Sequence, residues 1–437
     1  MKKDSAEYNG LDNGTESGPT IDSGNPLKRL VGARTFTSLR IPAYRFYWAA
    51  ALCQMAAMNM QMLARSSLIF KITNSTTMLG LMGVFNALPM LVLSLFGGII
   101  ADRVQKKYVM LAGQAGSAVV SLAIALSLTM GYLSTDNAGS WWVLAVAAVF
   151  QGTIMGLMMP SRQAYLPEIV GQKQLLNAIS LSNVGMSAMR LLAPAAAGFL
   201  IGDSYNYAVV YFTMTGLYVL AVVFVTFLPQ GGMIAISGRG ALADIKEGLR
   251  YLRGETTLLL VMLITLVAVV LSMPFGMLMP AFTEGILGVG PTGLGIIMSV
   301  SGAGAIVGSL TFASLPNKKR GLLYLISCLT MGLALAAFAA STTWELSLGI
   351  IIIVGLGQTG FMTLSNTLIQ YYVDDQYRGR VMSILMMQFG LTSFGTFLAG
   401  LLSESLGVQW VIGGFAGILV ILSLFALIFI PRVRRLD

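Results

Sequence analysis

Two arginines lie inside long apolar stretches of this sequence, where a charged side chain is rare. Arg65 belongs to the stretch 46–70 and Arg190 to the stretch 177–201. A charge at the centre of a membrane helix costs at least about 2.5–3.5 kcal/mol, so such a residue is expected to face protein or water. At 1.5 Å per residue, Arg190 lies roughly 21 Å along its helix, just beyond mid-depth. We expect both arginines to line a cavity. The alternatives are a side chain of Arg65 that reaches the interface and packing of Arg190 against helix carbonyls.

Uncharged amides inside other apolar stretches form a second set of candidate cavity residues. They are Asn59, Gln61, Gln151, Asn183, Gln358, Asn366 and Gln388. An amide donates and accepts hydrogen bonds, so it can orient a bound molecule. It can equally join two helices, and for any one amide that structural role is the better interpretation.

Acidic residues are missing from the centres of all these stretches. The 18 Asp and Glu residues fall in tails, loops or stretch ends, and histidine is absent. We find no nucleophile–base pair, no cluster of metal ligands and no phosphate-binding loop of the G-x-x-x-x-G-K-S/T type. The sequence therefore predicts no enzyme, no metal and no cofactor. Cationic side chains without buried acids favour a neutral or anionic ligand.

The elements that hold these residues are predicted to be membrane-spanning helices. The chain has 437 residues, of which 56% are hydrophobic and 10% charged, whereas soluble domains carry roughly 25% charged residues. About 20 apolar residues span the hydrocarbon layer as a helix. Twelve stretches qualify, at 46–70, 78–100, 108–132, 141–160, 177–201, 206–228, 257–282, 292–314, 321–341, 344–370, 381–403 and 408–430.

The basic residues predict the orientation of these twelve helices. With both termini in the cytoplasm, all Lys and Arg residues except Arg65, Lys71 and Arg190 lie in the tails and in the loops of the cytoplasmic side. Such a bias is typical of cytoplasmic loops. The net charge of +9 is thus explained by topology, and we expect no nucleic-acid partner.

The chain divides into four predicted parts. Residues 1–39 form a polar, disordered cytoplasmic tail, 40–229 a first bundle of six helices, 230–256 a cytoplasmic linker, and 257–437 a second bundle of six helices with a short cytoplasmic tail. Leu242, Ile245, Leu249 and Leu252 recur at helical spacing in the linker, which predicts an amphipathic interfacial helix. Basic loops at matching places in both halves indicate two repeats related by a pseudo-twofold axis normal to the membrane.

One loop carries the most specific motif in the sequence. Gly98-Ile99-Ile100-Ala101-Asp102-Arg103-Val104-Gln105-Lys106-Lys107 joins the second and third predicted helices. The pattern resembles the signature loop of the major facilitator superfamily, G-x-x-x-D-R/K-x-x-R/K-R/K. This resemblance implies that Asp102 and the cations Arg103, Lys106 and Lys107 close a cytoplasmic gate between the bundles. Arg378 and Arg380, before the eleventh helix, are expected in the same gate. The alternative is that these cations reflect only the cytoplasmic location of the loops and have no role in gating.

The fifth predicted helix carries a second motif, Ala193-Pro194-Ala195-Ala196-Ala197-Gly198. It resembles the G-P-x-x-G-G element of exporters in this superfamily, with alanine at two of the glycine positions. Proline removes a backbone hydrogen bond and bends a helix, while small neighbours allow close packing. The alternative is an ordinary proline kink.

The resemblance covers residues 40–430 and is closest to the bacterial branch that includes the enterobactin exporter and drug efflux permeases. It implies an all-α membrane protein in which two six-helix bundles rock around a central site. We expect a secondary-active exporter of small amphipathic, drug-like or siderophore-like molecules, coupled to protons, that works as a monomer among lipids of the cytoplasmic membrane. An importer or uniporter of a neutral or anionic molecule remains an alternative, and a membrane sensor without transport activity is a weaker one.

Overall fold

The computed structural model describes residues 37–103, 105–134, 137–230, 241–314, 318–374 and 376–436. Within these ranges all regular elements are helices. Their bounds are η1 Thr37–Arg40, α2 Pro42–Thr73, α3 Thr76–Arg103, α4 Lys106–Thr129, η2 Ala138–Trp141, α5 Trp142–Ile201, α6 Tyr207–Thr226, α7 Ala241–Gly254, α8 Thr256–Ser272, α9 Pro274–Gly285, α10 Pro291–Ser314, α11 Arg320–Ala340, α12 Trp344–Tyr372, α13 Arg378–Leu406, α14 Val408–Phe429 and α15 Pro431–Arg434.

Twelve membrane-spanning segments follow from these helices. Eleven are recognised by length and hydropathy alone, two of them within α5 and one formed by α8 and α9 together. The twelfth is α2, whose 32 residues give about 48 Å at 1.5 Å per residue. Its hydropathy is lowered by polar side chains such as Gln54 and Gln61, which are 1% and 6% exposed. Because α2 packs against α5 and α6, these polar groups face protein.

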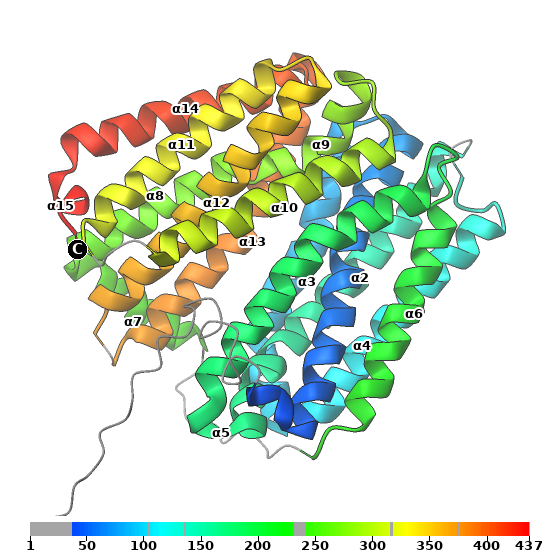
Figure 1. The fold of residues 1–437 in the computed structure, drawn as a ribbon, viewed down its shortest axis with the longest axis horizontal. Coiled ribbons are helices and arrows are strands. Elements are labelled where there is room, and N and C mark those ends of the chain that lie inside the picture. Colours follow the sequence, from blue (N-terminus) through cyan, green and yellow to red (C-terminus); the bar gives the residue numbers. More distant parts are fainter. Residues whose placement is uncertain are drawn as a thin grey trace, which may run out of the picture.

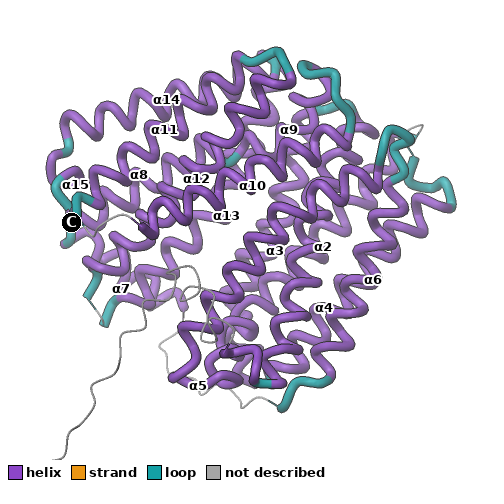
Figure 2. The backbone as a smooth tube through the Cα atoms, in the orientation of Figure 1, coloured by secondary structure: helices purple, strands orange, loops and turns teal. Residues whose placement is uncertain are grey.

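The twelve segments form two bundles joined by α7. Helices α2 to α6 make the first bundle and α8 to α14 the second (Figure 1). The bundles meet at one end, towards the upper right of Figure 1, and diverge towards the lower left, where α7 and the bend of α5 lie. The tube in Figure 2 shows that most loops are short. Large apolar side chains such as Trp410 and Phe429 are exposed on the outside, as expected for helices in lipid.

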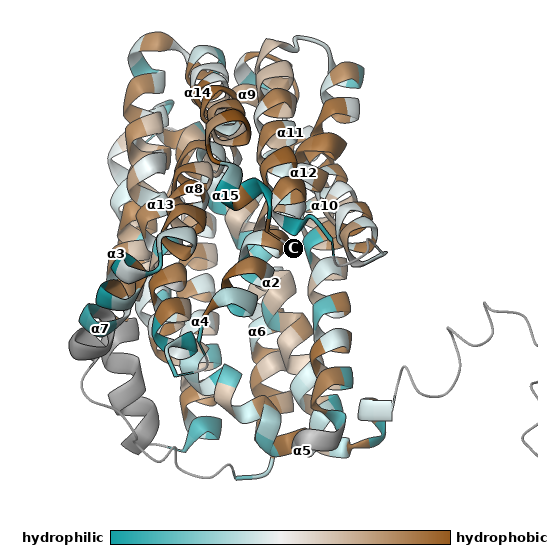
Figure 3. Ribbon diagram, turned by 90° about the vertical axis from the view of Figure 1, so that its left-hand side faces the viewer, coloured by the Kyte–Doolittle hydropathy of each residue, from teal (hydrophilic) through white to brown (hydrophobic). Residues whose placement is uncertain are grey.

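Two ends of the molecule need names. We call the end that carries α7, the start of α2 and the end of α6 the basic end, and the other end the opposite end. Figure 3 shows hydrophobic residues along the helices and hydrophilic ones around α7 and α15. At the basic end, Thr37–Arg40 form η1, which begins within the last residues of the predicted tail. Ser38 is 0% exposed there and donates to Asn177 Oδ1 at 2.6 Å.

Two predicted loops are helical in the structure. Helix α5 continues through the predicted loop after residue 160 and is interrupted at Gly171, whose φ of 66° and ψ of 167° are not helical. Pro160 and Pro167 are accommodated within it. Most of the motif that begins at Gly98 is helical and not loop. Helix α3 extends to Arg103 and α4 begins at Lys106.

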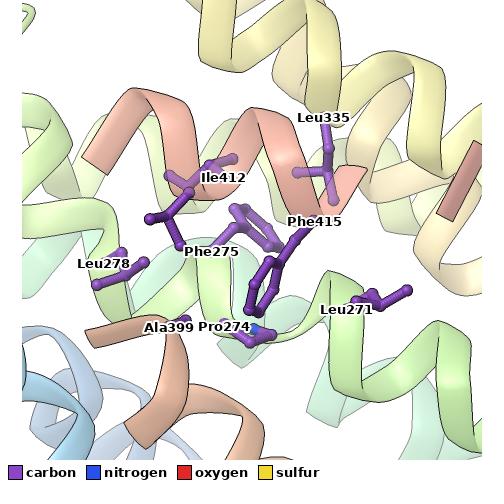
Figure 4. A pocket seen from close by; sticks show the side chains of 9 residues that line it. Leu271, Pro274, Phe275, Leu278, Leu335, Ala399, Ile412 and Phe415 are labelled. Carbon is purple, nitrogen blue, oxygen red and sulfur yellow. The ribbon is translucent and has the colours of Figure 1, made fainter. Parts of the chain in front are cut away.

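The seventh span is broken, although the sequence predicted one helix over 257–282. Helix α8 ends at Ser272 and α9 begins at Pro274, because proline has no N–H to continue the ladder. A small apolar hollow lies beside the break (Figure 4). It is lined by Leu271, Pro274, Phe275, Leu278, Leu335, Ala399, Val411, Ile412 and Phe415.

Candidate functional site

The region where the bundles begin to diverge is bounded by side chains from both of them. A Cβ added to Gly276 on α9 would lie 3.6 Å from Cε of Met62 on α2. Asn59 lies one turn from Met62 towards the basic end and donates to Met55 O at 2.7 Å. From the second bundle, Gln358 Nε2 donates to Sδ of Met273, at the helix break, at 3.3 Å. Two predicted amides, Asn59 and Gln358, therefore approach the same central region.

Methionines are frequent around these two amides. The chain contains 27. Met62 is exposed, and Met55, Met58, Met273, Met277 and Met362 are partly buried. Methionine side chains are flexible and polarizable, so they adapt to apolar ligands of different shape. The sequence analysis missed them, although their number was visible in the composition. This surface can hold an amphipathic molecule while the amides orient it.

A second hollow lies inside the second bundle between α8, α12 and α13. Asn366 and Gln388 both line it, together with Thr265, Val269, Met362, Ser365 and Leu385. Gln388 Nε2 donates to Met262 O at 3.0 Å, while its Oε1 has no hydrogen-bond partner. Asn366 Nδ2 donates to Met362 O of its own helix at 3.1 Å. The structure thus brings these two predicted residues together, with one acceptor still available.

The remaining candidates are distributed over two other places. Arg65 and Gln151 lie inside the first bundle beside Tyr218 of α6, and Gln61 is buried. Asn183 and Arg190 are exposed along α5. The predicted cavity residues therefore do not form one site.

The motif on α5 lies at a close contact between the bundles, the α5–α10 seam. A Cβ added to Gly198 would lie 2.6 Å from Pro291 O and 3.0 Å from the Cα of Gly295. Ala193 and Ala197 are 4% and 0% exposed. Only residues without a larger side chain allow this backbone approach.

Pro194 also changes the hydrogen bonding along this seam. A proline cannot donate to the carbonyl four residues before it, here that of Arg190. The backbone N–H of the next residue, Ala195, donates to Ser299 Oγ on α10 at 3.0 Å. Thr292 Oγ1 donates to Gly198 O at 3.4 Å. Residues of the second bundle thus form hydrogen bonds with backbone groups of α5 next to Pro194.

The second contact between the bundles, the α3–α13 seam, carries a charge. Thr76 Oγ1 donates to Gly400 O at 2.8 Å. Glu404 Oε2 accepts hydrogen bonds from Ser75 Oγ at 2.9 Å, Thr76 Oγ1 at 3.2 Å, Thr77 N at 3.0 Å and Thr77 Oγ1 at 3.0 Å. A carboxylate at the first turn of α3 also interacts favourably with the helix dipole. Glu404 therefore fastens the two bundles at the opposite end.

Three of the predicted gate residues at the basic end have described side-chain contacts. Lys106 pairs with Glu168 of its own bundle. Lys107 Nζ donates to Thr226 O at 2.7 Å and to Leu228 O at 2.5 Å. Arg380 pairs with Glu247 of α7 at 3.1 Å.

The remaining predicted gate residues lie at the ends of α3 and α13 at the basic end. Arg378 begins α13. The backbones of Gly98, Asp102 and Arg103 belong to α3, but their side chains lie outside the described residues. Contacts between the bundles thus run from Thr76 and Gly400 to Leu91 and Gly390 on one seam. On the other they run from Gly198 to Gly302, where a Cβ would lie 3.2 Å from Arg190 O. The helices diverge from there to the basic end (Figure 1).

The comparisons with known proteins agree with this architecture. The chain is 25% identical over 399 residues to the multidrug efflux pump Tap of Mycolicibacterium fortuitum, covering 89% of this chain and 95% of Tap. It is 24% identical over 341 residues to the enterobactin exporter EntS of Shigella boydii, covering 76% of each. A solved D-xylose-proton symporter has the same fold, with a TM-score of 0.72 at 12% identity over 90% of this chain and 99% of that one.

The family assignment rests on a match over most of the chain. The model of the family described as transmembrane secretion effector matches residues 33–437. The fold and the two bundles fit this match. The chain therefore belongs to the transmembrane secretion effector family of the major facilitator superfamily and is a multi-pass membrane transporter.

Proposed function

We propose that this transporter exports small amphipathic molecules across the cytoplasmic membrane by alternating access, in exchange for protons. The observation that carries the proposal is the distribution of contacts between the bundles. They are fastened at the opposite end, through Gly198 and Glu404, and diverge towards the basic end. With the basic end in the cytoplasm, as cationic loops favour, this conformation takes up cargo from the cell interior.

The cargo class follows from the lining of the central region. Methionines around Asn59 and Gln358 offer an adaptable apolar surface with two polar groups. Such surfaces accept several ligands of similar size and polarity. Two relatives are described as a multidrug efflux pump and an enterobactin exporter, which supports export of drug-like or siderophore-like molecules.

The experiment is an efflux assay in cells or proteoliposomes with a panel of drugs and siderophores, with and without a protonophore. We expect accumulation of at least one amphipathic compound to fall when the transporter is present, and the protonophore to abolish this effect. Efflux that persists with the protonophore would reject proton exchange. Transport of the compound down its own concentration gradient, inward as well as outward, would instead favour the uniporter alternative.

The orientation needs its own test, because the direction of transport depends on it. Reporter tags at Asn137 and Lys318 lie at opposite ends of the molecule. We expect the tag at Lys318 in the cytoplasm and the tag at Asn137 outside. The reverse result would mean that the observed conformation is open to the exterior. It would then support import and contradict the proposed export.

A further inference from the structure

The hollow between α8, α12 and α13 contains a buried hydrogen-bond acceptor that lacks a donor. We call it the amide hollow, and its described lining residues are Thr265, Val269, Met362, Ser365, Asn366, Leu385 and Gln388. Gln388 is 6% exposed, and its Oε1 atom has no hydrogen-bond partner in the described part of the chain. Buried polar atoms are almost always paired. This oxygen therefore indicates a donor that comes from another molecule.

The orientation of the Gln388 amide is fixed by its nitrogen. Nε2 donates to Met262 O at 3.0 Å. A carbonyl oxygen can only accept hydrogen bonds, so the NH₂ end of the amide has to face Met262. Oε1 is then the atom without a partner. Because an amide oxygen also only accepts, the missing group has to be a hydrogen-bond donor.

The two hydroxyl groups in the lining of the amide hollow already have acceptors. Thr265 Oγ1 donates to Val261 O at 2.7 Å, and Ser365 Oγ donates to Met362 O at 3.3 Å. Asn366 Nδ2 donates to Met362 O at 3.1 Å, and its NH₂ group has a second hydrogen. The lining thus combines one unpaired acceptor with one remaining donor.

The size and the charge of the amide hollow restrict the group that it can bind. Its volume is about 10 Å³, which is room for about one water molecule. None of its described lining residues is charged, and burial of an ammonium group without a counter-charge is strongly unfavourable. A hydroxyl group meets both conditions, because it is neutral, has the size of water and can both donate and accept a hydrogen bond.

Helix α12 connects the amide hollow with the central region. Gln358, Met362 and Asn366 follow one another at a spacing of four residues, and all three are partly exposed. Residues at this spacing share a helix face, and Asn366 lies about 12 Å from Gln358 along the helix. This is the direction of the basic end, because Asp374, just after α12, donates its N–H to Tyr251 Oη of α7 at 3.2 Å. On this face a molecule that moves inward from the basic end meets Asn366 before Gln358.

We propose that the amide hollow binds a hydroxyl group of the cargo, which donates to Gln388 Oε1 and accepts from Asn366 Nδ2. It is a first recognition site on the way to the central region, and it selects amphipathic molecules with a free hydroxyl over their methyl ethers. The inference rests on the proposed function, because that function makes the bound molecule a cargo. The hydroxyl preference itself is measurable as binding, without transport.

The test compares the binding of naphthylmethanol and of its methyl ether to the purified full-length protein by fluorescence anisotropy. Both probes are neutral and amphipathic, and only the alcohol can donate a hydrogen bond. We expect the alcohol to bind with a Kd about fivefold lower, as for one neutral hydrogen bond. Gln388→Met keeps the length of the side chain but removes the acceptor. It should raise the Kd of the alcohol to that of the ether and leave the Kd of the ether unchanged.

Control variants separate the amide hollow from other buried amides. Gln151→Met is the matched control, because Gln151 is a buried amide of the first bundle whose Oε1 is also unpaired. It should keep the preference for the alcohol. If Gln388→Met does not fold, Asn366→Leu has to reduce the preference. Asn366 is suited to this because it is partly exposed and its amide donates only within its own helix.

Three results would overturn the proposal. The first is equal or undetectable saturable binding of both probes by the unmodified protein, as for a hollow that holds only water. The second is a preference for the alcohol that persists in Gln388→Met. The third is tighter binding of naphthylmethylamine than of the alcohol, which would indicate an ammonium site. Efflux of other compounds without a hydroxyl preference would reject the hydroxyl site alone, whereas the preference without any efflux would support the site and reject export.

Discussion

At the α5–α10 seam a Cβ added to Gly198 would lie 2.6 Å from Pro291 O, and at the α3–α13 seam one added to Gly400 would lie 2.4 Å from Thr76 O. In both, a glycine of one bundle meets a carbonyl at the start of a helix of the other. One turn further along α13 is Glu404, whose carboxylate caps α3. One turn beyond Gly198 is Gly202, with a φ of 58° and no side chain.

This difference indicates that the two seams have different roles in the movement of the bundles. The α5–α10 seam is held by backbone packing and neutral hydrogen bonds, which do not depend on pH. The α3–α13 seam adds a carboxylate that accepts four hydrogen bonds and that protonation weakens. We therefore expect the first seam to act as a pivot and the second as a latch. The variants below probe this division, from the largest expected effect to the smallest.

Gly198→Leu is expected to have the largest effect, because the new side chain meets backbone atoms that cannot move aside. Overpacking of this kind costs about 1–3 kcal/mol, and here it forces the bundles apart at the pivot. We expect transport to be lost and the Tm of the purified protein to fall. Gly216→Leu is the matched control, since a Cβ at Gly216 meets nothing within 4 Å. Normal transport by correctly inserted Gly198→Leu protein would show that the seam is not a pivot.

The residues of this pivot show what the sequence predicted and what it did not. The small residues around Pro194 indicated close packing, and the twelve spans were found from hydropathy. Hydropathy contains no information about which helix Gly198 meets, so Gly295 and Ser299 were not identified. The break at Pro274 was missed because the apolar stretch continues through it.

The sequence indicates little about the latch. Glu404 lies near the end of an apolar stretch, and its partner Thr77 lies 327 residues away along the chain. Hydropathy and helical periodicity do not predict a contact across such a separation.

Glu404→Gln is expected to have an intermediate effect, because it preserves the shape of the latch but removes its charge. The side chain is exposed, so we expect a loss of about 1–2 kcal/mol, below the value for buried charged hydrogen bonds. The population open at the opposite end should rise several-fold. Labelling of a cysteine at Met62 with an impermeant maleimide, in a background with Cys53 and Cys328 replaced by serine, measures this change.

The controls for the latch use pH and a second acid. Acidification of the medium at the opposite end should increase labelling of the unmodified protein, because protonated Glu404 holds α3 less tightly. Glu404→Gln should not respond. Glu345→Gln, at another exposed acid of the same end, should label at the original rate. A pH response that is unchanged in Glu404→Gln would assign the latch to a different group.

Ser299→Ala is expected to have the smallest effect, and it tests whether the pivot depends on hydrogen bonds as well as on packing. The variant leaves the N–H of Ala195 without its acceptor, which costs about 1 kcal/mol for one neutral hydrogen bond. We expect a Tm lowered by a few degrees, a modest decrease in transport rate and no change in its pH dependence. Ser309→Ala is the matched control, because Ser309 Oγ donates only to Ile306 O of its own helix. If Ser299→Ala altered the pH dependence as Glu404→Gln does, the two seams would act as one unit, and the distinction between pivot and latch would be lost.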